Sequence, residues 1–87
     1  MSYEVEITEP AKKQLRKLER EIQERISAAL ERIRIRPDSY VSKLVGDNSY
    51  KLRVGDYRII MEINRAEQRI LVLKVAHRKN VYDFIIF

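Results

Sequence analysis

The chain of 87 residues lacks cysteine and tryptophan, and its single histidine is His77. Without cysteine there is no disulfide and no cysteine-ligated metal, and a reducing cytoplasm is the expected location. One histidine is too few for a multi-histidine metal site. We therefore expect neither a bound metal nor any other cofactor.

Long apolar runs are also missing, and glycine and proline occur only twice each. No run approaches the roughly 20 apolar residues of a membrane-spanning helix, and no signal peptide opens the chain. We therefore expect no membrane contact. The content of 45% hydrophobic and 36% charged residues is typical of a globular protein. The length predicts a single domain over residues 1–87, with one core of modest size.

Positive charge is concentrated in the second half of the chain. The net charge is +5, with a pI near 9.7. Residues 1–49 carry ten Lys/Arg against nine Asp/Glu, whereas residues 50–87 carry eight against four. A surplus of this sign favours a polyanionic partner, which the second half would bind.

The stretch "YKLRVGDYRIIMEI" predicts a β-hairpin, because apolar and polar residues alternate on both sides of Gly55-Asp56. A two-residue turn there pairs Val54 with Tyr57 and places Arg53 directly opposite Arg58. Like charges in that position destabilise a sheet by roughly 0.2–1 kcal/mol. The pair therefore suggests an anion-binding face, although charges on a solvated face can also serve solubility alone.

A second hairpin is expected around a three-residue loop, Arg65-Ala66-Glu67, with Asn64 opposite Gln68. This register places Arg58 opposite Lys74, so that Arg53, Arg58 and Lys74 form one row of cations. If the strand continues, Arg78 stays on the same side. The same register divides the apolar residues into two sets. Leu71, Leu73 and Val75 lie in the core, whereas Ile60, Ile70 and Val72 lie beside the cations. The second set needs cover from the C-terminal segment or a partner.

The first half of the chain predicts a short strand over Tyr3–Ile7, then helix. Thr8 is the expected N-cap, and apolar residues recur at helical spacing until Pro37. A continuous helix over Glu9–Arg36 would be about 40 Å long, too long for a domain with a radius of gyration of about 12 Å. We therefore predict a break near Leu18–Ile22 and two antiparallel helices. A linker over residues 37–49 should follow, pinned to the core by Leu44 and Val45.

The charged faces of these helices have two interpretations. They can be solvent-exposed surfaces with pairs such as Glu21 with Arg25, or a phosphate-contacting surface built on Lys12, Lys13, Arg16 and Lys17. On the sheet, cations beside His77 and Tyr82 suit RNA cleavage by the substrate's own 2′-hydroxyl. A non-catalytic RNA-binding sheet would carry the same residues.

The sequence as a whole resembles RelE-type toxins of the RelE/ParE superfamily. The resemblance rests on "YEVEITEPAKKQLRKL", "KLVGDNSYKLRVGDYRIIMEI" and "VLKVAHRKNVY", in this order and spacing. It implies an α+β fold in which an N-terminal strand, a helical hairpin and a three-stranded antiparallel meander form a four-stranded sheet, followed by a short C-terminal segment. It also implies a cognate antitoxin, bound in a toxin–antitoxin hetero-oligomer.

The resemblance further implies ribosome-dependent cleavage of mRNA in the decoding site, leaving a 2′,3′-cyclic phosphate. Arg58 would stabilise the transition-state charge, Arg78 would serve the leaving group or phosphate, and Tyr82 would orient a base or help to deprotonate the 2′-hydroxyl. Lys51 and Arg53 would hold the backbone. We expect further substrate contacts from Lys74, His77, Lys79, Lys12, Lys13 and Arg16. By strand parity His77 points away from Arg78, which favours a structural or orienting role over catalysis. The alternatives are a ParE-like inhibitor of DNA gyrase without catalysis, or a non-catalytic RNA-binding protein.

Overall fold

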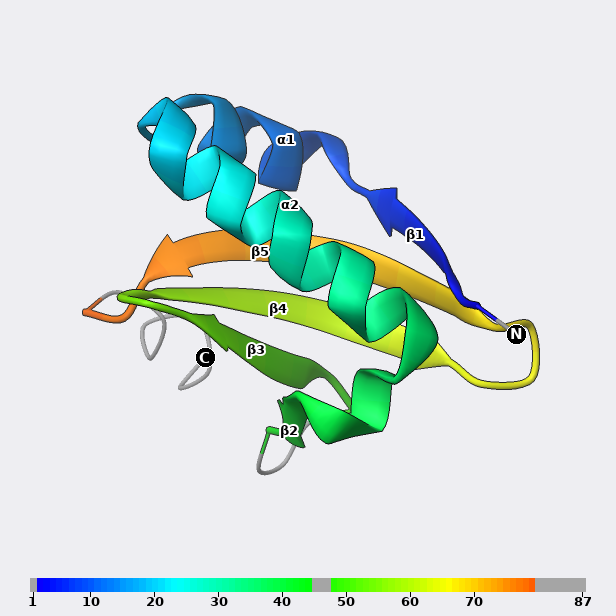
Figure 1. The fold of residues 1–87 in the computed structure, drawn as a ribbon. Coiled ribbons are helices and arrows are strands. Elements are labelled where there is room, and N and C mark those ends of the chain that lie inside the picture. The colour runs from blue at the N-terminus through cyan, green and yellow to red at the C-terminus, as the bar shows by residue number, and fades with distance from the viewer. Residues whose placement is uncertain (1, 45–47, 80–87) are drawn as a thin grey trace.

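The computed structural model describes residues 2–44 and 48–79. Within these ranges, five strands form one sheet in the order β1-β5-β4-β3-β2, and two α-helices cover one of its faces (Figure 1). The elements in chain order are β1 (Glu4–Ile7), α1 (Glu9–Arg16), α2 (Arg20–Ile35), the 3-10 helix η1 (Pro37–Ser39), β2 (Val41–Lys43), β3 (Tyr50–Val54), β4 (Tyr57–Asn64) and β5 (Arg69–His77).

The α+β class is confirmed, but the sheet has one strand more than predicted. The extra strand, β2, lies within residues 37–49, where a linker was expected, and pairs Val41 with Leu52 of β3. The predicted anchor Leu44 is buried and packs against Ile60, whereas Val45 lies outside the described residues. At the opposite edge β1 runs parallel to β5, so the sheet is mixed.

The two predicted helices are present, and the chain turns back between them (Figure 1). The break spans residues 17–19, slightly ahead of the predicted position. No glycine or proline marks it. Instead, the Gln23 side chain donates to the carbonyl of Leu18 at 2.8 Å, which satisfies a backbone acceptor that a helix end leaves open. The pair expected between Glu21 and Arg25 is not formed among the described residues, and Arg20 contacts Glu24 instead, at 3.4 Å.

The core lies between the helices and the covered face of the sheet. Its largest fully buried side chains are Ile26, Ile33, Ile59, Met61, Ile70 and Val72. Burial of such side chains contributes roughly 1.5–3 kcal/mol each and fixes which face of every strand turns inward. Among the described residues, no helix is both long enough and apolar enough to cross a membrane.

The first hairpin has the predicted register. Val54 pairs with Tyr57, Arg53 with Arg58, and the pairing continues without a shift to Tyr50 with Met61. Gly55 adopts a positive φ of 57°, a conformation that glycine reaches without the steric cost of a Cβ atom. The identity of the turn thus sets the whole β3–β4 register.

The second hairpin differs from the prediction because its loop is one residue longer, over residues 65–68. Asn64 pairs with Arg69 rather than with Gln68. The Asn64 side chain accepts a hydrogen bond from the backbone N–H of Glu67 at 3.0 Å, and Gln68 takes a positive φ of 55°. Asparagine commonly stabilises a turn in this way, so the loop closes without glycine.

A β-bulge in β5 adds a second one-residue shift. Met61 pairs with Val72, but the next residue, Ile60, pairs with Lys74, which leaves Leu73 as the extra residue. The Thr8 hydroxyl lies within hydrogen-bonding distance of the Val72 carbonyl at 2.9 Å and the Leu73 carbonyl at 3.3 Å. The N-terminus of α1 therefore binds the bulge directly.

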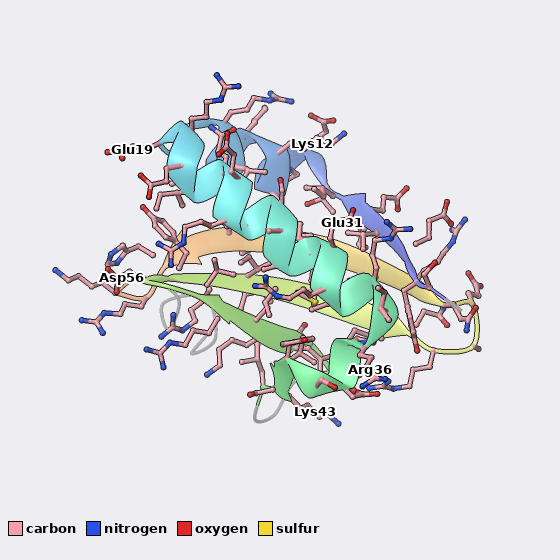
Figure 2. All side chains as sticks on the ribbon, in the orientation of Figure 1. Lys12, Glu19, Glu31, Arg36, Lys43 and Asp56 are labelled. Atoms are coloured by element: carbon pink, nitrogen blue, oxygen red, sulfur yellow. The ribbon has the colours of Figure 1, made fainter. Side chains whose placement is uncertain are left out.

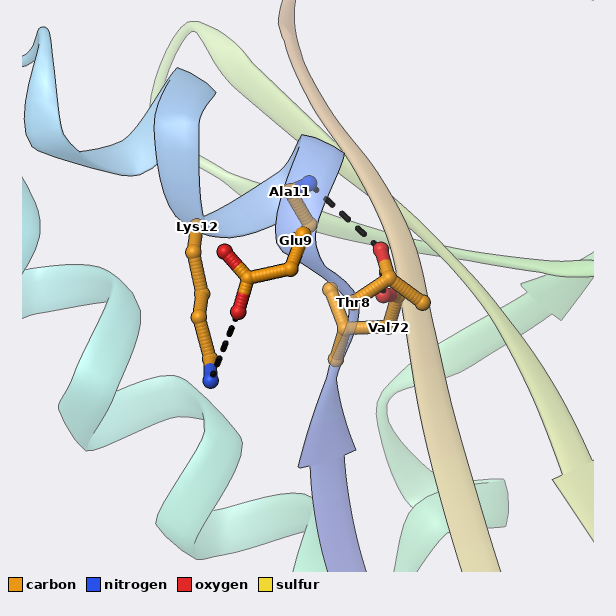
Figure 3. A network of polar contacts seen from close by, with 5 residues as sticks. All are labelled: Thr8, Glu9, Ala11, Lys12 and Val72. Atoms are coloured by element: carbon orange, nitrogen blue, oxygen red, sulfur yellow. Dashed lines mark hydrogen bonds and ion pairs between the residues drawn. The ribbon is translucent and has the colours of Figure 1, made fainter.

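Thr8 is also the predicted N-cap, since its side chain accepts from the backbone N–H of Ala11 at 3.4 Å (Figure 3). Its backbone N–H donates to the Val72 carbonyl at 3.1 Å. Farther along α1, the Gln14 side chain accepts from the backbone N–H of Val75 at 2.8 Å. One helix thus satisfies backbone groups of β5 on both sides of the bulge.

The longer loop and the bulge overturn part of the predicted arrangement. Ile70 and Val72 are buried in the core rather than lying beside the cations, and Leu71 pairs with Glu62 on the opposite face. Arg58 faces Ala76 instead of Lys74. The longer loop and the bulge each move the β4–β5 pairing by one residue. After the bulge the pairing is therefore displaced by two residues, so each side chain again points to the face that was predicted for it. Val75 accordingly still faces the core, as predicted.

The β4–β5 loop is tied to η1 by an arginine. Arg65 makes two hydrogen bonds to the Asp38 carboxylate, at 2.8 and 2.6 Å, and lies 5.7 Å from the centre of the Tyr50 ring. The hydrogen bond to Asp38 raises the pKa of Arg65 above its ordinary value. This arginine is therefore held in a structural contact at the opposite end of β4 from Gly55.

Candidate functional site

Four of the predicted cations share the face of the sheet that the helices leave uncovered, which we call the outer face. One row across β3, β4 and β5 is Lys51, Ile60 and Lys74, and the adjacent row is Arg53, Arg58 and Ala76. The single row predicted from the sequence is thus replaced by two. Lys51 and Lys74 flank an apolar residue, and the two arginines lie directly opposite each other.

Arg58 is held by the turn that precedes it. Its Nη1 donates to the carbonyls of Gly55, at 3.1 Å, and Tyr57, at 3.0 Å. The Nε and Nη2 donors contact no acceptor within the described part of the chain. A guanidinium fixed on one side by backbone carbonyls keeps its remaining donors available to two oxygens of a phosphate. The Arg58 side chain thus has a defined orientation even though it lies opposite the like charge of Arg53.

Neither Lys51 nor Arg53 has a hydrogen-bond or ion-pair partner in residues 2–44 and 48–79. Lys51 is half-buried and Arg53 is exposed. The outer face therefore presents positive charge at this end of the sheet that is not neutralised by a carboxylate on the described residues. Such a surface attracts anions.

Arg78 reaches the same turn from the end of β5. Its backbone N–H donates to the Asp56 carbonyl at 2.7 Å, and its Nε lies 3.9 Å from the Asp56 carboxylate. Figure 2 shows Asp56 at the tip of the β3–β4 hairpin. Arg58 of β4 and Arg78, the residue after β5, therefore both contact the same two-residue turn.

His77 lies next to this turn, on the core side by strand parity. It pairs with Tyr57, and the two rings meet edge to face with centroids 5.4 Å apart at 81°. Its Nδ1 accepts from the backbone N–H of Lys79 at 3.3 Å. The imidazole therefore contacts the Tyr57 ring and the backbone where the chain leaves β5, on the side of the sheet that strand parity predicted.

Other predicted site residues are not brought to this cluster. Lys12, Lys13 and Arg16 lie on α1, which packs on the covered face. Lys12 contacts Glu9 at 3.5 Å (Figure 3). The sheet therefore separates these cations from the outer face. Tyr82 lies outside the described residues.

A larger hollow, of about 740 Å³, opens at the far end of the sheet. Its polar lining includes Glu4, Glu6, Glu62, Asn64 and Arg69. Two arginines also line it, but Arg65 pairs with Asp38 and Arg69 with Glu4. The three carboxylates would repel the phosphates of a nucleic acid, so this hollow does not compete with the cationic end as a site for RNA. No group of three or more potential ligands among His, Cys, Asp and Glu gathers in the described ranges to hold a metal.

Arg25 is a residue of this region that sequence reasoning missed, having assigned it to a surface pair. Its guanidinium lies 3.8–4.0 Å from the position a Cβ would occupy at Gly55. The available signal was its place between Ile22 and Ile26, at the border of the apolar stripe of α2. A long side chain at that border can extend along the covered face to the tip of the hairpin.

A family model and a curated relative match the sequence of this chain. The family model described as the ParE toxin of the type II toxin–antitoxin system parDE matches residues 5–82. Toxin RelE3 of Methanocaldococcus jannaschii is 42% identical over 45 residues, which are 51% of this chain and 49% of that protein. The match thus spans about half the length of this curated relative.

Solved structures are similar over nearly the whole fold. A chain of the RelBE2 toxin–antitoxin complex from Mycobacterium tuberculosis superposes with a TM-score of 0.82 and 25% identity, covering 90% of this chain and 100% of that chain. A mutant of the Escherichia coli toxin RelE in the free state gives a TM-score of 0.77 and 26% identity, covering 99% and 96%. The chain described here belongs to the ParE toxin family, and it is a RelE-type toxin of the RelE/ParE superfamily.

Proposed function

We propose that this toxin is a ribosome-dependent mRNA endonuclease. The 2′-hydroxyl of the substrate would lose its proton and attack the adjacent phosphorus, and the 5′-oxygen of the next nucleotide would leave with a proton. The products are a 2′,3′-cyclic phosphate and a free 5′-hydroxyl. The observation that carries the proposal is Arg58, held by two backbone carbonyls with its other donors directed to no described acceptor.

The residue roles follow from charge and position. Arg58 stabilises the negative charge that develops on the phosphate oxygens. Lys51, Arg53 and Lys74 bind the RNA backbone on either side of it. Arg78 contacts Asp56, in the turn that holds Arg58, and serves the leaving oxygen or the phosphate. Tyr82 is proposed to orient a base or to help deprotonate the 2′-hydroxyl, as the resemblance to RelE-type toxins implies.

The need for the ribosome follows from what the cluster offers. Among the described residues, the carboxylate at this turn is Asp56, which borders the hollow on the covered side of the sheet rather than the outer face. Arginine is a poor proton acceptor because it stays charged. The imidazole of His77 faces Tyr57. Alignment of the 2′-hydroxyl with the scissile phosphate must then supply a large part of the acceleration, and holding the mRNA in one geometry is how the ribosome would provide it.

Primer extension on ribosome-bound mRNA tests this function. We expect cuts within the decoding site when ribosomes are present and much slower cleavage of the same mRNA when they are absent. Comparable rates in both samples would contradict the dependence on the ribosome. A non-catalytic RNA-binding protein would block translation without producing cuts.

Inhibition of DNA gyrase is a second candidate, favoured by the family model, which carries the name of ParE. The two functions share one fold, so a supercoiling assay with purified gyrase separates them. Inhibition of supercoiling together with intact mRNA would replace the nuclease proposal by this one.

We also propose that a cognate antitoxin binds and inactivates this protein, as the relative from Mycobacterium tuberculosis was solved in a toxin–antitoxin complex. Ile70 and Val72 were expected to need cover from a partner, but both are buried in the core and do not support this proposal. Lys51 and Arg53 on the outer face have no carboxylate partner among the described residues, and an acidic segment would complement them. Co-expression with the product of the adjacent open reading frame should yield a stable complex and restore growth. Growth arrest without a complex would contradict this expectation.

A further inference from the structure

A second, smaller hollow lies on the covered side of the β3–β4 turn. Its volume is about 150 Å³. Residues of α2 and of the hairpin line it: Ile22, Arg25, Val54, Gly55, Asp56 and Tyr57. The lining thus combines two aliphatic side chains, an aromatic ring, a cation and a carboxylate around one small hollow.

The Arg25 cation has no ion-pair or hydrogen-bond partner among the residues described, although its guanidinium lies against Gly55. Asp56 contacts Arg78 only at 3.9 Å and keeps acceptor capacity. A donor and an acceptor therefore border the same hollow without satisfying each other. Separate donor and acceptor groups beside an aromatic side chain suit a planar heterocycle better than a phosphate, which the carboxylate would repel.

We infer that this hollow binds one unstacked base of the mRNA next to the cleavage site, with cytosine preferred; the inference rests on the proposed nuclease function. A cavity of about 150 Å³ is large enough for a single six-membered ring. Single-stranded bases stack on aromatic rings and on arginine guanidinium groups. A carboxylate accepts from the N4 amine of cytosine, while Arg25 donates to the O2 oxygen. Uracil presents an acceptor, O4, where cytosine has its amine.

The hollow and the proposed phosphate site are two sides of one turn. The carbonyls of Gly55 and Tyr57 hold Arg58 on the outer face. The same two residues line the hollow, and His77 supports the Tyr57 ring from its edge. A base bound in the hollow would thereby fix which phosphate reaches Arg58. This arrangement makes Arg25 and Asp56 specificity-determining residues rather than catalytic ones.

The test compares Arg25→Ala with Arg36→Ala, which removes the same charge from the opposite end of α2, far from Asp56 (Figure 2). Cut sites are mapped by primer extension on ribosomes carrying a pool of mRNAs. We expect the wild type and Arg36→Ala to prefer cytosine over uracil at one position beside the cut. Arg25→Ala should reduce that preference by about tenfold, the scale of one base-specific contact, with little change in the rate at uracil sites.

A uniform loss of cleavage in Arg25→Ala with an unchanged cut-site distribution would show that Arg25 contacts phosphate and would overturn the inference. A second measurement does not depend on cleavage. Trimers of 2′-O-methyl cytidine and uridine are titrated while the backbone amide NMR signals of Gly55 and Tyr57 are followed. We expect tighter binding of the cytidine trimer, lost in Arg25→Ala. Equal responses to both trimers would reject the base site even if the toxin proves not to be a nuclease.

Discussion

Replacing Arg58 by alanine is expected to lower the single-turnover rate of mRNA cleavage at saturating ribosome by about 10²-fold or more. This is the scale on which the loss of one preorganised electrostatic group slows a reaction that develops negative charge. Arg58 is preorganised because one nitrogen is anchored to Gly55 and Tyr57 while the other donors remain for the phosphate. Arg58→Lys should recover only part of the rate, since an ammonium group cannot fill both tasks.

The stability of the Arg58→Ala protein should remain near that of the wild type. Removal of the charge relieves repulsion from Arg53, which favours folding by a few tenths of a kcal/mol. Loss of the two carbonyl contacts opposes this gain, although water replaces them at the surface. Thermal unfolding measures the balance. A strongly destabilised Arg58→Ala protein that still cleaves normally would mean that the arginine is structural and that the active site lies elsewhere.

Arg69→Ala is the matched control for Arg58→Ala. Arg69 pairs with Glu4 at 3.5 Å and lies in the outer-face row of Asn64 and Glu4, at the end of the sheet away from the hairpin tip. Its removal subtracts one positive charge from the same face. We expect it to leave the rate of the chemical step unchanged, so that an effect of net charge alone is separated from an effect of position.

Replacing Thr8 by valine should produce the largest loss of stability that we expect from a change of a few atoms. The hydroxyl caps α1 and donates to the Val72 carbonyl at the β5 bulge, and valine keeps the shape without these bonds. Loss of an N-cap costs about 1 kcal/mol. The backbone N–H of residue 8 still donates to the Val72 carbonyl, so loss of the hydroxyl's own hydrogen bond adds about 0.5–1.5 kcal/mol. For a domain of this size, each kcal/mol corresponds to a fall of about 4–8 °C in Tm.

Thr8→Ser is the control for this change, because serine keeps the hydroxyl and loses only a methyl group. Its melting temperature should be close to that of the wild type.

The bulge also places Lys74 on the outer face, since strand parity from Val72 would otherwise turn it toward the core. We therefore expect Thr8→Val to lose cleavage activity as well as stability. Equal melting temperatures for Thr8→Val and the wild type would show that the bulge does not depend on this hydroxyl.

The first hairpin could be predicted from the sequence because its signal is local. Gly55 and Asp56 determine the turn, and two alternating runs leave a single register in which one face is apolar. The position of the opposed pair Arg53 and Arg58 followed directly. The same logic failed at the second hairpin, where Asn64 and Gln68 close a longer loop without glycine.

The bulge was beyond local reasoning because its cause is tertiary. Thr8 and Gln14, more than 60 residues away along the chain, supply the partners of the β5 backbone. The strand β2 was missed for a similar reason, since Val41 is the only apolar residue in its three positions and the pairing with β3 decides the structure.

The common face of four predicted site residues could be derived from the sequence, but their arrangement on that face could not. Lys51, Arg53, Arg58 and Lys74 do share a face, because even the wrong register kept their parity. The cations of α1 were expected to contribute, yet the sheet lies between. Arg25 was missed because its proximity to Gly55 depends on how α2 crosses the hairpin.

The parallel pairing of β1 with β5 also governs the order in which the protein can form during synthesis. Glu4 pairs with Arg69, 65 positions later, so β1 can pair with β5 only after the later part of the chain has been synthesised. Contacts this distant along the chain close late in folding. Lys74 and Arg78 belong to the same late segment. A nascent chain on the ribosome therefore lacks both a closed sheet and a complete cationic cluster. The cationic cluster on the outer face should therefore be complete only once β5 has been made and has paired with β4.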